Sequence, residues 1–208
     1  FLLRAEENGL IVPINEWVIH EACREAKSWH RLGLGHLRIG INLSPVQFRR
    51  VNVAALVLKA LDATGLDPKC LDLEITENIV MEKTESVISV LRQLSELGCG
   101  ISIDDFGTGY SSLNYIKQFP IDRIKIDQTF VRNMVTDPSD HTIVRTVAHL
   151  GHSLGLTVVA EGVETEEQAT LLKADGCDVM QGYLYGRPMP AQDLIALVRS
   201  GPVLEKSA

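Results

Sequence analysis

Short runs of branched apolar residues alternate along the chain with longer stretches whose apolar residues recur at helical spacing. Runs of roughly four to eight such residues between turn signals are typical of β-strands. The predicted strands are LRIGINLS (37–44), CLDLEI (70–75), GISIDD (100–105), RIKID (123–127), LTVVAE (156–161) and DVMQGYLY (178–185). Because helical stretches separate these strands, we expect a parallel sheet with helical crossovers.

Two of the intervening stretches, SVISVLRQL and TIVRTVAHLGHSL, show the helical pattern clearly. The apolar residues that would share a helix face are Val87, Val90, Leu91 and Leu94 in the first, and Ile143, Val147, Leu150 and Leu154 in the second. Glycines stand where helices should end, at Gly98, Gly155 and Gly176. Thr165 and Gln168 have the spacing of a capping box, which predicts a helix that begins after Thr165.

Repeated βα units form either an open doubly wound sheet or a barrel. Polar residues lie in the second half or at the end of each predicted strand: Asn42, Glu74, Asp104, Asp105, Lys125, Glu161 and Gln181. In a barrel these ends converge on one mouth, whereas an open sheet would spread them along a line. We therefore expect an α/β fold of the TIM-like (β/α) barrel type, with about six of the usual eight strands. Residues 1–208 are expected to form one domain with a frayed tail at 201–208.

Composition excludes several classes of protein. A net charge of −7 and a pI near 5.4 argue against binding to DNA or RNA polymers, which requires a concentrated basic surface. No apolar run approaches the roughly 20 residues that a membrane helix needs, and Glu6 and Glu7 stand where a signal peptide would be basic. We therefore expect a soluble, cytoplasmic chain without membrane contact.

The cysteines are Cys23, Cys70, Cys99 and Cys177. They lie far apart in the sequence and form no CxxC pair, so neither a zinc knuckle nor a disulfide framework is indicated. We expect reduced structural thiols.

The acidic residues at the strand ends point to metal chemistry. Carboxylates that meet at one place raise one another's pKa unless positive charge neutralises them, and a divalent metal ion is the usual partner. Asp104 and Asp105, with Glu74, Glu161 and the amide oxygen of Asn42, offer only oxygen ligands, which suit Mg²⁺ or Mn²⁺. Two such ions about 4 Å apart would activate a water and stabilise the leaving oxygen of a phosphoester.

Lys125 is open to three interpretations: a Schiff-base nucleophile as in barrel aldolases, a charge that orients the attacking water, or a plain ion pair with Asp127. The surrounding acids would keep its amine protonated and poorly nucleophilic, which favours the second. His149 and His152 have a spacing that can bind metal, but their helix should lie outside the barrel. The GTG stretch at 107–109 is neither a P-loop nor a dinucleotide motif and is interpreted as a loop hinge beside the acids.

Together these motifs resemble one family closely, the EAL domains, which hydrolyse the bacterial messenger cyclic di-GMP. The matching stretches follow the family's order over nearly the whole chain: INLSPVQF, LEITEN, IDDFGTGYSSL, IKIDQTFV, VAEGVET and QGYLYGRPMP. The resemblance implies a two-metal phosphodiesterase that opens cyclic di-GMP to linear pGpG. It implies Mg²⁺ or Mn²⁺ as cofactors and inhibition by Ca²⁺.

Carried over position by position, the resemblance assigns the metal ligands to Asn42, Glu74, Asp104, Asp105 and Glu161, with Asp104 as the bridge. Glu161 looks like the proposed general base, and Lys125 resembles the lysine that contacts the catalytic water. Gln181 and Asp105 correspond to residues on the substrate side of the site. Glu77 looks like the glutamate that fixes the DFGTG loop and so couples loop order to metal binding.

One departure affects the expected activity. The family is named after a Glu-Ala-Leu strand whose glutamate binds metal, and no EAL tripeptide occurs in this sequence. The chain is expected to begin after that strand, which leaves two exposed sheet edges that favour association, for example as a homodimer. It would be a fragment of a longer enzyme, an inactive module, or a barrel completed by another chain. The alternative function is therefore an inactive EAL-type module that binds cyclic di-GMP or a protein, in a parent with a sensor or GGDEF-type domain.

Overall fold

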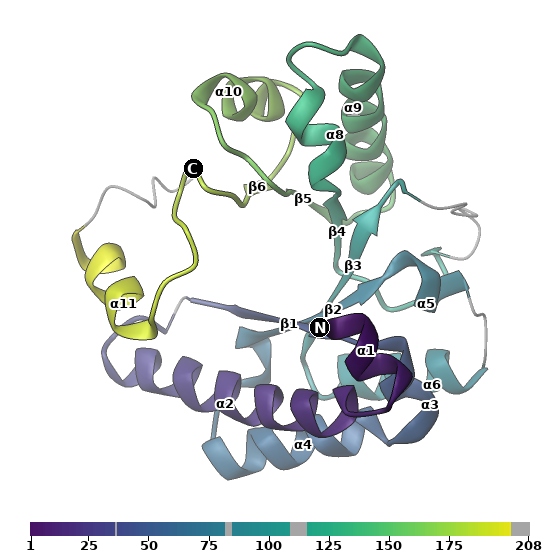
Figure 1. Ribbon diagram of the computed structural model, residues 1–208, viewed down its shortest axis with the longest axis vertical. Coiled ribbons are helices and arrows are strands. Elements are labelled where there is room, and N and C mark those ends of the chain that lie inside the picture. Colours follow the sequence, from purple (N-terminus) through teal and green to yellow (C-terminus); the bar gives the residue numbers. More distant parts are fainter. Residues whose placement is uncertain (36, 82–84, 109–115, 201–208) are drawn as a thin grey trace.

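The computed structural model describes residues 1–35, 37–81, 85–108 and 116–200 (Figure 1). Within these ranges the strands form one parallel sheet in the order β1-β2-β3-β4-β5-β6. Their bounds are β1 (Ile39–Leu43), β2 (Leu71–Thr76), β3 (Gly100–Phe106), β4 (Arg123–Ile126), β5 (Thr157–Ala160) and β6 (Val179–Met180). The prediction of parallel strands in chain order is confirmed.

The sheet curves around a central space and most helices pack on its outer side (Figure 1). The helices are α1 (Leu2–Glu7), α2 (Ile11–Arg31), α3 (Pro45–Arg50), α4 (Val53–Thr64), η1 (Pro68–Cys70), α5 (Glu77–Met81), α6 (Glu85–Glu96), α8 (Gln128–Asn133), α9 (Pro138–Ser153), α10 (Glu166–Ala174) and α11 (Ala191–Ser200). Arg199 of α11 donates a hydrogen bond to the carbonyl of Leu32, just after α2. The arrangement is a partial TIM-like barrel, as predicted.

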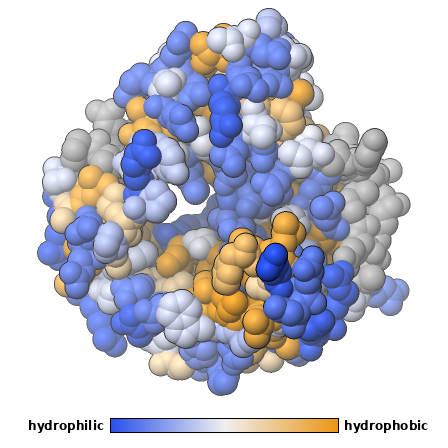
Figure 2. All heavy atoms as spheres, in the orientation of Figure 1, coloured by the Kyte–Doolittle hydropathy of each residue, from blue (hydrophilic) through white to orange (hydrophobic). Residues whose placement is uncertain are grey.

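The two faces of the sheet differ in polarity because successive side chains of a strand point to opposite sides. In β2, Leu71, Leu73 and Ile75 are fully buried in the apolar core, whereas Asp72 and Glu74 between them are only partly buried. The apolar side chains pack against the outer helices, and the polar ones face the centre of the partial barrel. The space-filling view shows an opening at this centre with a largely hydrophilic border (Figure 2).

Local signals in the sequence agree with several element ends. Gly98, Gly155 and Gly176 have φ values of 96°, 73° and 90°, the left-handed conformation that ends helices. Thr165 and Gln168 form the expected capping box at the start of α10.

Two predictions of local structure need correction. The strand expected over 178–185 is limited to β6, because the chain turns after Met180 and the N–H of Tyr185 bonds the carbonyl of Gly182. On α9 the prediction is correct for Val147, whereas the other buried residues are Val144, Ala148 and Gly151. Ile143, Leu150 and Leu154 are only partly buried beside this stripe. The face expected on α6 is correct for Val87, Leu91 and Leu94, whereas Val90 is half-buried.

All four cysteines are free, as expected. Burial raises the pKa of Cys23 to about 11 and that of Cys99 and Cys177 to about 12, which makes these thiols unreactive near neutral pH. No helix in the described ranges combines the length and the apolar character needed to cross a bilayer. The tail at 201–208 and Gly109 of the GTG stretch lie outside the described residues.

Candidate functional site

An ammonium group surrounded by carboxylates forms the centre of the site. The Nζ atom of Lys125 lies 2.7 Å from Oε2 of Glu74, 3.0 Å from Oδ1 of Asp104 and 2.6 Å from Oε1 of Glu161. These four residues come from β4, β2, β3 and the residue after β5, so four adjacent strands supply one charged cluster. We call Glu74, Asp104, Lys125 and Glu161 the upper ring.

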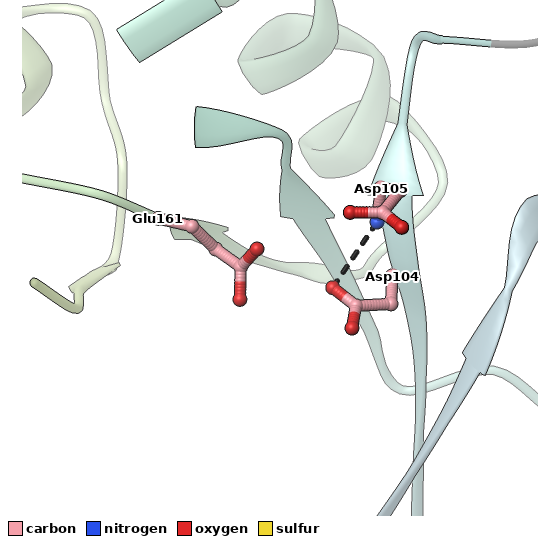
Figure 3. Close-up of side chains that lie close together, drawn as sticks. All are labelled: Asp104, Asp105 and Glu161. Atoms are coloured by element: carbon pink, nitrogen blue, oxygen red, sulfur yellow. Dashed lines mark hydrogen bonds between the residues drawn. The ribbon is translucent and has the colours of Figure 1, made fainter. Parts of the chain in front are cut away.

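Asp105 lies beside the upper ring (Figure 3). Oxygens of Asp104, Asp105 and Glu161 all lie within 4.8 Å of one another, close enough to bind one metal ion. The N–H of Asp105 donates a 3.1 Å hydrogen bond to Oδ1 of Asp104, which orients the buried Asp104 carboxylate. The sequence prediction that these strand ends converge is therefore correct for five of the assigned residues.

Adjacent acids reach the same place because the backbone of Asp105 is unusual. Its φ of 55° is the single left-handed value among the described residues other than glycine. The register between β3 and β4 also shifts between Ile103 and Phe106. In a regular strand, Asp104 and Asp105 would point to opposite faces, and this local distortion brings both carboxylates to the mouth.

The charges of the upper ring determine its protonation. Burial alone would lower the pKa of Lys125, but the neighbouring carboxylates of Glu74 and Glu161 raise it above its usual value. Burial raises the pKa of Glu74 and Glu161, and the Lys125 charge opposes that rise. Lys125 is thus a firmly protonated lysine, which argues against the Schiff-base role of an aldolase.

Asp127 was considered above only as an ion-pair partner of Lys125, and that pairing is wrong. Its Oδ1 instead accepts hydrogen bonds from the N–H and the hydroxyl of Thr129, which cap the start of α8. Asp127 also shares a hydrogen bond with Asp105, whose pKa rises to about 6 through burial, this bond and the charge of Asp104. Sequence analysis missed this contact because Asp105 and Asp127 belong to different elements and are far apart in the sequence.

Gly40 on β1 leaves room for the side chain of Glu74. A Cβ atom on Gly40 would lie 2.4 Å from Oε1 of Glu74, so only glycine accommodates the carboxylate in this position. Asn42 follows on the same side of β1 and stands opposite Glu74 in the strand register. Its side chain is exposed, and its carbonyl accepts a 3.3 Å hydrogen bond from Asn15. Asn42 is therefore placed next to the ring, on the face that the prediction required.

Glu77 contacts the loop that follows β3. Its Oε2 accepts a 3.2 Å hydrogen bond from the N–H of Gly107, although thirty positions separate the two residues. Glu77 is only 5% exposed, and no partner within the described part of the chain bonds its Oε1. The contact expected between Glu77 and the DFGTG loop is present.

Gln181 lies near the end of β5, next to Glu161. Its N–H bonds the carbonyl of Ala160 at 2.8 Å, and its carbonyl accepts from the N–H of Val163. A Cβ on the following Gly182 would lie within 2.3 Å of the backbone nitrogen of Val163, so the two loops pack backbone to backbone. Gln181 is exposed. His149 and His152 are distant from this site in the fold, and His152 pairs with Asp178 at 3.0 Å.

The residues present fit divalent metal ions. The upper ring and Asp105 contain more carboxylates than the single Lys125 ammonium can neutralise. All the donors are oxygens, the preferred ligands of Mg²⁺, Mn²⁺ and Ca²⁺. A cation at Asp104, Asp105 and Glu161 would neutralise the remaining negative charge.

The model of the EAL domain family matches residues 1–188, and the chain belongs to this family. The bifunctional diguanylate cyclase/cyclic di-GMP phosphodiesterase MucR of Pseudomonas aeruginosa is 47% identical over 198 residues, which are 95% of this chain and 29% of MucR. The cyclic di-GMP phosphodiesterase PdeR of Escherichia coli is 39% identical over 191 residues, 92% of this chain and 29% of PdeR. The chain thus spans less than a third of the length of these relatives. Both relatives are named as cyclic di-GMP phosphodiesterases, the activity that the resemblance predicts.

Solved structures agree with the fold. The PaMucR phosphodiesterase in its c-di-GMP complex has a TM-score of 0.90 at 47% identity, over 93% of this chain and 78% of that one. Complexes of Klebsiella pneumoniae BlrP1 with cy-diGMP and either manganese or calcium have TM-scores of 0.76 and 0.73 at 34% and 33% identity. They cover 85% and 84% of this chain and 44% of BlrP1 in each case. The expected fold, family and class of cofactor, a divalent metal ion, are confirmed.

Proposed function

We propose that this chain supplies the catalytic rim of a cyclic di-GMP phosphodiesterase that opens the cyclic dinucleotide to linear pGpG. One observation carries the proposal: Lys125 holds Glu74, Asp104 and Glu161 together at the mouth of the partial barrel, beside Asp105. An acid-rich cluster with one fixed ammonium can bind cations and leave a hydrogen-bond donor for a water or a phosphate oxygen. Membership of the EAL family supports the same function.

The roles follow from charge and position. Asn42, Glu74, Asp104, Asp105 and Glu161 would hold the metal ions, which supply Lewis-acid stabilisation of the phosphodiester and a lower pKa for bound water. Lys125 remains protonated, so it donates a hydrogen bond and orients the water rather than removing its proton. Glu161, partly buried with a raised pKa, is the proposed general base. Gln181 and Asp105 contact the substrate side, and Glu77 holds the loop.

The finer expectations on cofactor and context belong to this proposal. Mg²⁺ and Mn²⁺ support turnover, whereas Ca²⁺ binds without supporting it, since the larger ion takes more ligands in a looser geometry. The chain acts in the cytoplasm, where it can form a homodimer, in a parent protein that carries a sensor or GGDEF-type domain.

The test measures binding and turnover separately. The purified chain is incubated with cyclic di-GMP and Mn²⁺, linear product is measured by chromatography, and binding of the dinucleotide is measured by calorimetry with Ca²⁺. We expect pGpG with Mn²⁺, and binding without product with Ca²⁺. Binding without product under every metal condition would instead identify a receptor module, and absence of both would overturn the proposal.

A matched pair of variants assigns the effect to the ring. Lys125→Met removes the central ammonium, and we expect product formation to fall by about 100-fold or more, the usual effect of losing an electrostatic group at a reaction centre. Lys59→Met removes a lysine whose side chain is 67% exposed and pairs with Glu16 on the outer helices. This control should keep full activity.

A further inference from the structure

A second charged cluster lies directly beneath the upper ring. Nη1 of Arg123 lies 2.8 Å from Oδ1 of Asp72, and the hydroxyl of Ser102 donates a 2.8 Å hydrogen bond to Oδ2 of the same carboxylate. The Asp72 and Arg123 side chains are only 15% and 16% exposed. We call Asp72, Ser102 and Arg123 the lower layer.

The lower layer repeats the arrangement of the upper ring one pleat earlier along the same strands. The two members of each pair are two positions apart on one strand, and side chains two positions apart share a face. The pairs are Asp72 and Glu74 on β2, Ser102 and Asp104 on β3, and Arg123 and Lys125 on β4. In both levels a basic side chain of β4 crosses β3 to pair with an acid of β2: Arg123 with Asp72 below, and Lys125 with Glu74 above. Lys125 therefore has two acids of β2 near it, Glu74 at its own level and Asp72 below.

Arg123 and Ser102 together occupy both oxygens of Asp72. The charges of Asp72 and Lys125 nevertheless affect each other, because Lys125 favours the ionised form of Asp72. Without Arg123, Asp72 would be a partly buried carboxylate with no bonded cation, and such a group draws in any ammonium within reach. The ammonium nearest along β4 is that of Lys125.

We propose that Arg123 is a positioning residue that keeps Lys125 in the upper ring by neutralising Asp72. Neutralised by Arg123, Asp72 attracts the lysine less strongly than Glu74, Asp104 and Glu161 do. The predicted position of Lys125 can be tested whether or not the chain is an enzyme. The predicted effect on turnover rests on the proposed function.

Gly100 on β3 supports the proposal and offers a way to test it without changing any charge. A Cβ atom on Gly100 would lie 2.7 Å from both Nη1 of Arg123 and Oδ1 of Asp72, so an alanine there would intrude between the two partners. The φ of Gly100 is not in the left-handed region, so alanine adds no backbone strain. The chain thus leaves open the space that this ion pair needs.

Other charges near Asp72 are not equivalent to Arg123. Arg38 is exposed and lies close enough to affect the pKa of Asp72, but no bond joins the two in the described part of the chain. Asp122, which also influences Asp72, accepts a 2.8 Å hydrogen bond from the N–H of Ile101. Arg38→Gln is therefore a control that removes the same charge without freeing the carboxylate.

The direct test is the metal-free crystal structure of Arg123→Gln. We expect Nζ of Lys125 within hydrogen-bond distance of Asp72, with at least one of its three ion pairs in the upper ring broken. In Asp72→Asn/Arg123→Gln, where no free carboxylate remains, the lysine should return to the ring. A lysine that keeps all three of these ion pairs in Arg123→Gln overturns the proposal, and this readout does not depend on any activity.

Mn²⁺ affinity, measured by calorimetry, gives a second readout. A lysine drawn out of the ring leaves its carboxylates less neutralised, so Arg123→Gln and Gly100→Ala should each bind Mn²⁺ more tightly, by roughly 3- to 10-fold. The double variant and Arg38→Gln should stay within about 2-fold of the wild type. A purely structural role predicts the opposite, weaker binding in the single variants and no recovery in the double variant, and that result would contradict the proposal.

Turnover gives a third readout where the wild-type chain is active. Arg123→Gln should lower kcat by roughly 10-fold with little change in KM, since Lys125 acts on the water and not on binding of the dinucleotide. The neutral double variant should recover kcat to within about 3-fold. If Arg123→Gln does not fold, Gly100→Ala retains every charge and is tested by the same crystal and calorimetric criteria.

Discussion

The upper ring and the lower layer share strands β2, β3 and β4, the same face of the sheet and similar burial, but their charge balance differs. In the lower layer one guanidinium and one hydroxyl satisfy one carboxylate. In the upper ring one ammonium faces three carboxylates, with Asp105 close by as a fourth. A buried charged cluster that is balanced holds strands together, whereas one with excess acid needs a cation from solution.

The largest expected effect comes from removing an acid from the ring. Asp104→Asn eliminates the carboxylate that contacts Lys125 and the N–H of Asp105, so Mn²⁺ affinity should fall roughly 100-fold or more and any hydrolysis should cease. Calorimetry with Mn²⁺ measures the affinity. Asp62→Asn, at an exposed position on α4, is the control and should change nothing. Wild-type affinity in Asp104→Asn would mean that excess acid does not define the site.

A smaller effect is expected from crowding the ring without removing charge. Gly40→Ala places a Cβ 2.4 Å from Oε1 of Glu74, so the carboxylate must move, and Mn²⁺ affinity should fall roughly 10-fold. Stability in urea should change little, because the obstructing atom is the end of a flexible side chain. Gly35→Ala, where the nearest atom would be 4.0 Å away, serves as the control. Equal Mn²⁺ affinities for the two variants would contradict the assignment of Glu74 as a metal ligand.

The pH dependence of metal binding tests the role of Asp105. Its pKa of about 6 lies above the ordinary value because of burial, the hydrogen bond with Asp127 and the charge of Asp104. Below pH 6 the metal must displace a proton, so Mn²⁺ affinity should fall up to tenfold per pH unit there and level off above pH 7. In Asp127→Asn this transition should move to lower pH. An affinity that is flat between pH 5 and 7 would contradict the assignment of Asp105 as a ligand.

The same shift predicts the stability of the metal-free chain. Because the pKa of Asp105 is higher in the folded state than in the unfolded state, its protonated form favours folding. This contribution is fully present below the unfolded pKa of about 4 and is lost as pH rises through about 6. Urea unfolding without metal should therefore show a small loss of stability between pH 4 and 7. Asp105→Asn, which cannot ionise, should lose that part of the pH dependence.

The smallest effect concerns the loop beside the ring. Glu77→Ala removes the acceptor of the Gly107 N–H, and exchange of that amide with solvent should become about 10-fold faster while the fold is retained. Glu77→Gln keeps an oxygen acceptor and should preserve most of the protection. Unchanged exchange in Glu77→Ala would exclude Glu77 from control of the loop.

Much of the fold and site follows from local features of the sequence. Alternating apolar runs and helical stretches predict a parallel sheet in chain order, and acids at successive strand ends predict a shared mouth. The errors arise where tertiary packing overrides local pattern. After Met180 the chain turns and packs backbone to backbone on Val163, so the strand expected over 178–185 ends early. The contact between Asp127 and Asp105 was not predicted, because the two residues are distant in the sequence.

The sequence alone determined which residue types reach the rim, because strand alternation and strand ends are local properties of the chain. Only the tertiary structure decided which of these residues form ion pairs with one another. Lys125 joins acids from three other strands, and Arg123 occupies Asp72, through contacts between residues up to fifty-one positions apart. Such pairing depends on strand register and on the space left by Gly40 and Gly100, which no short stretch of sequence specifies.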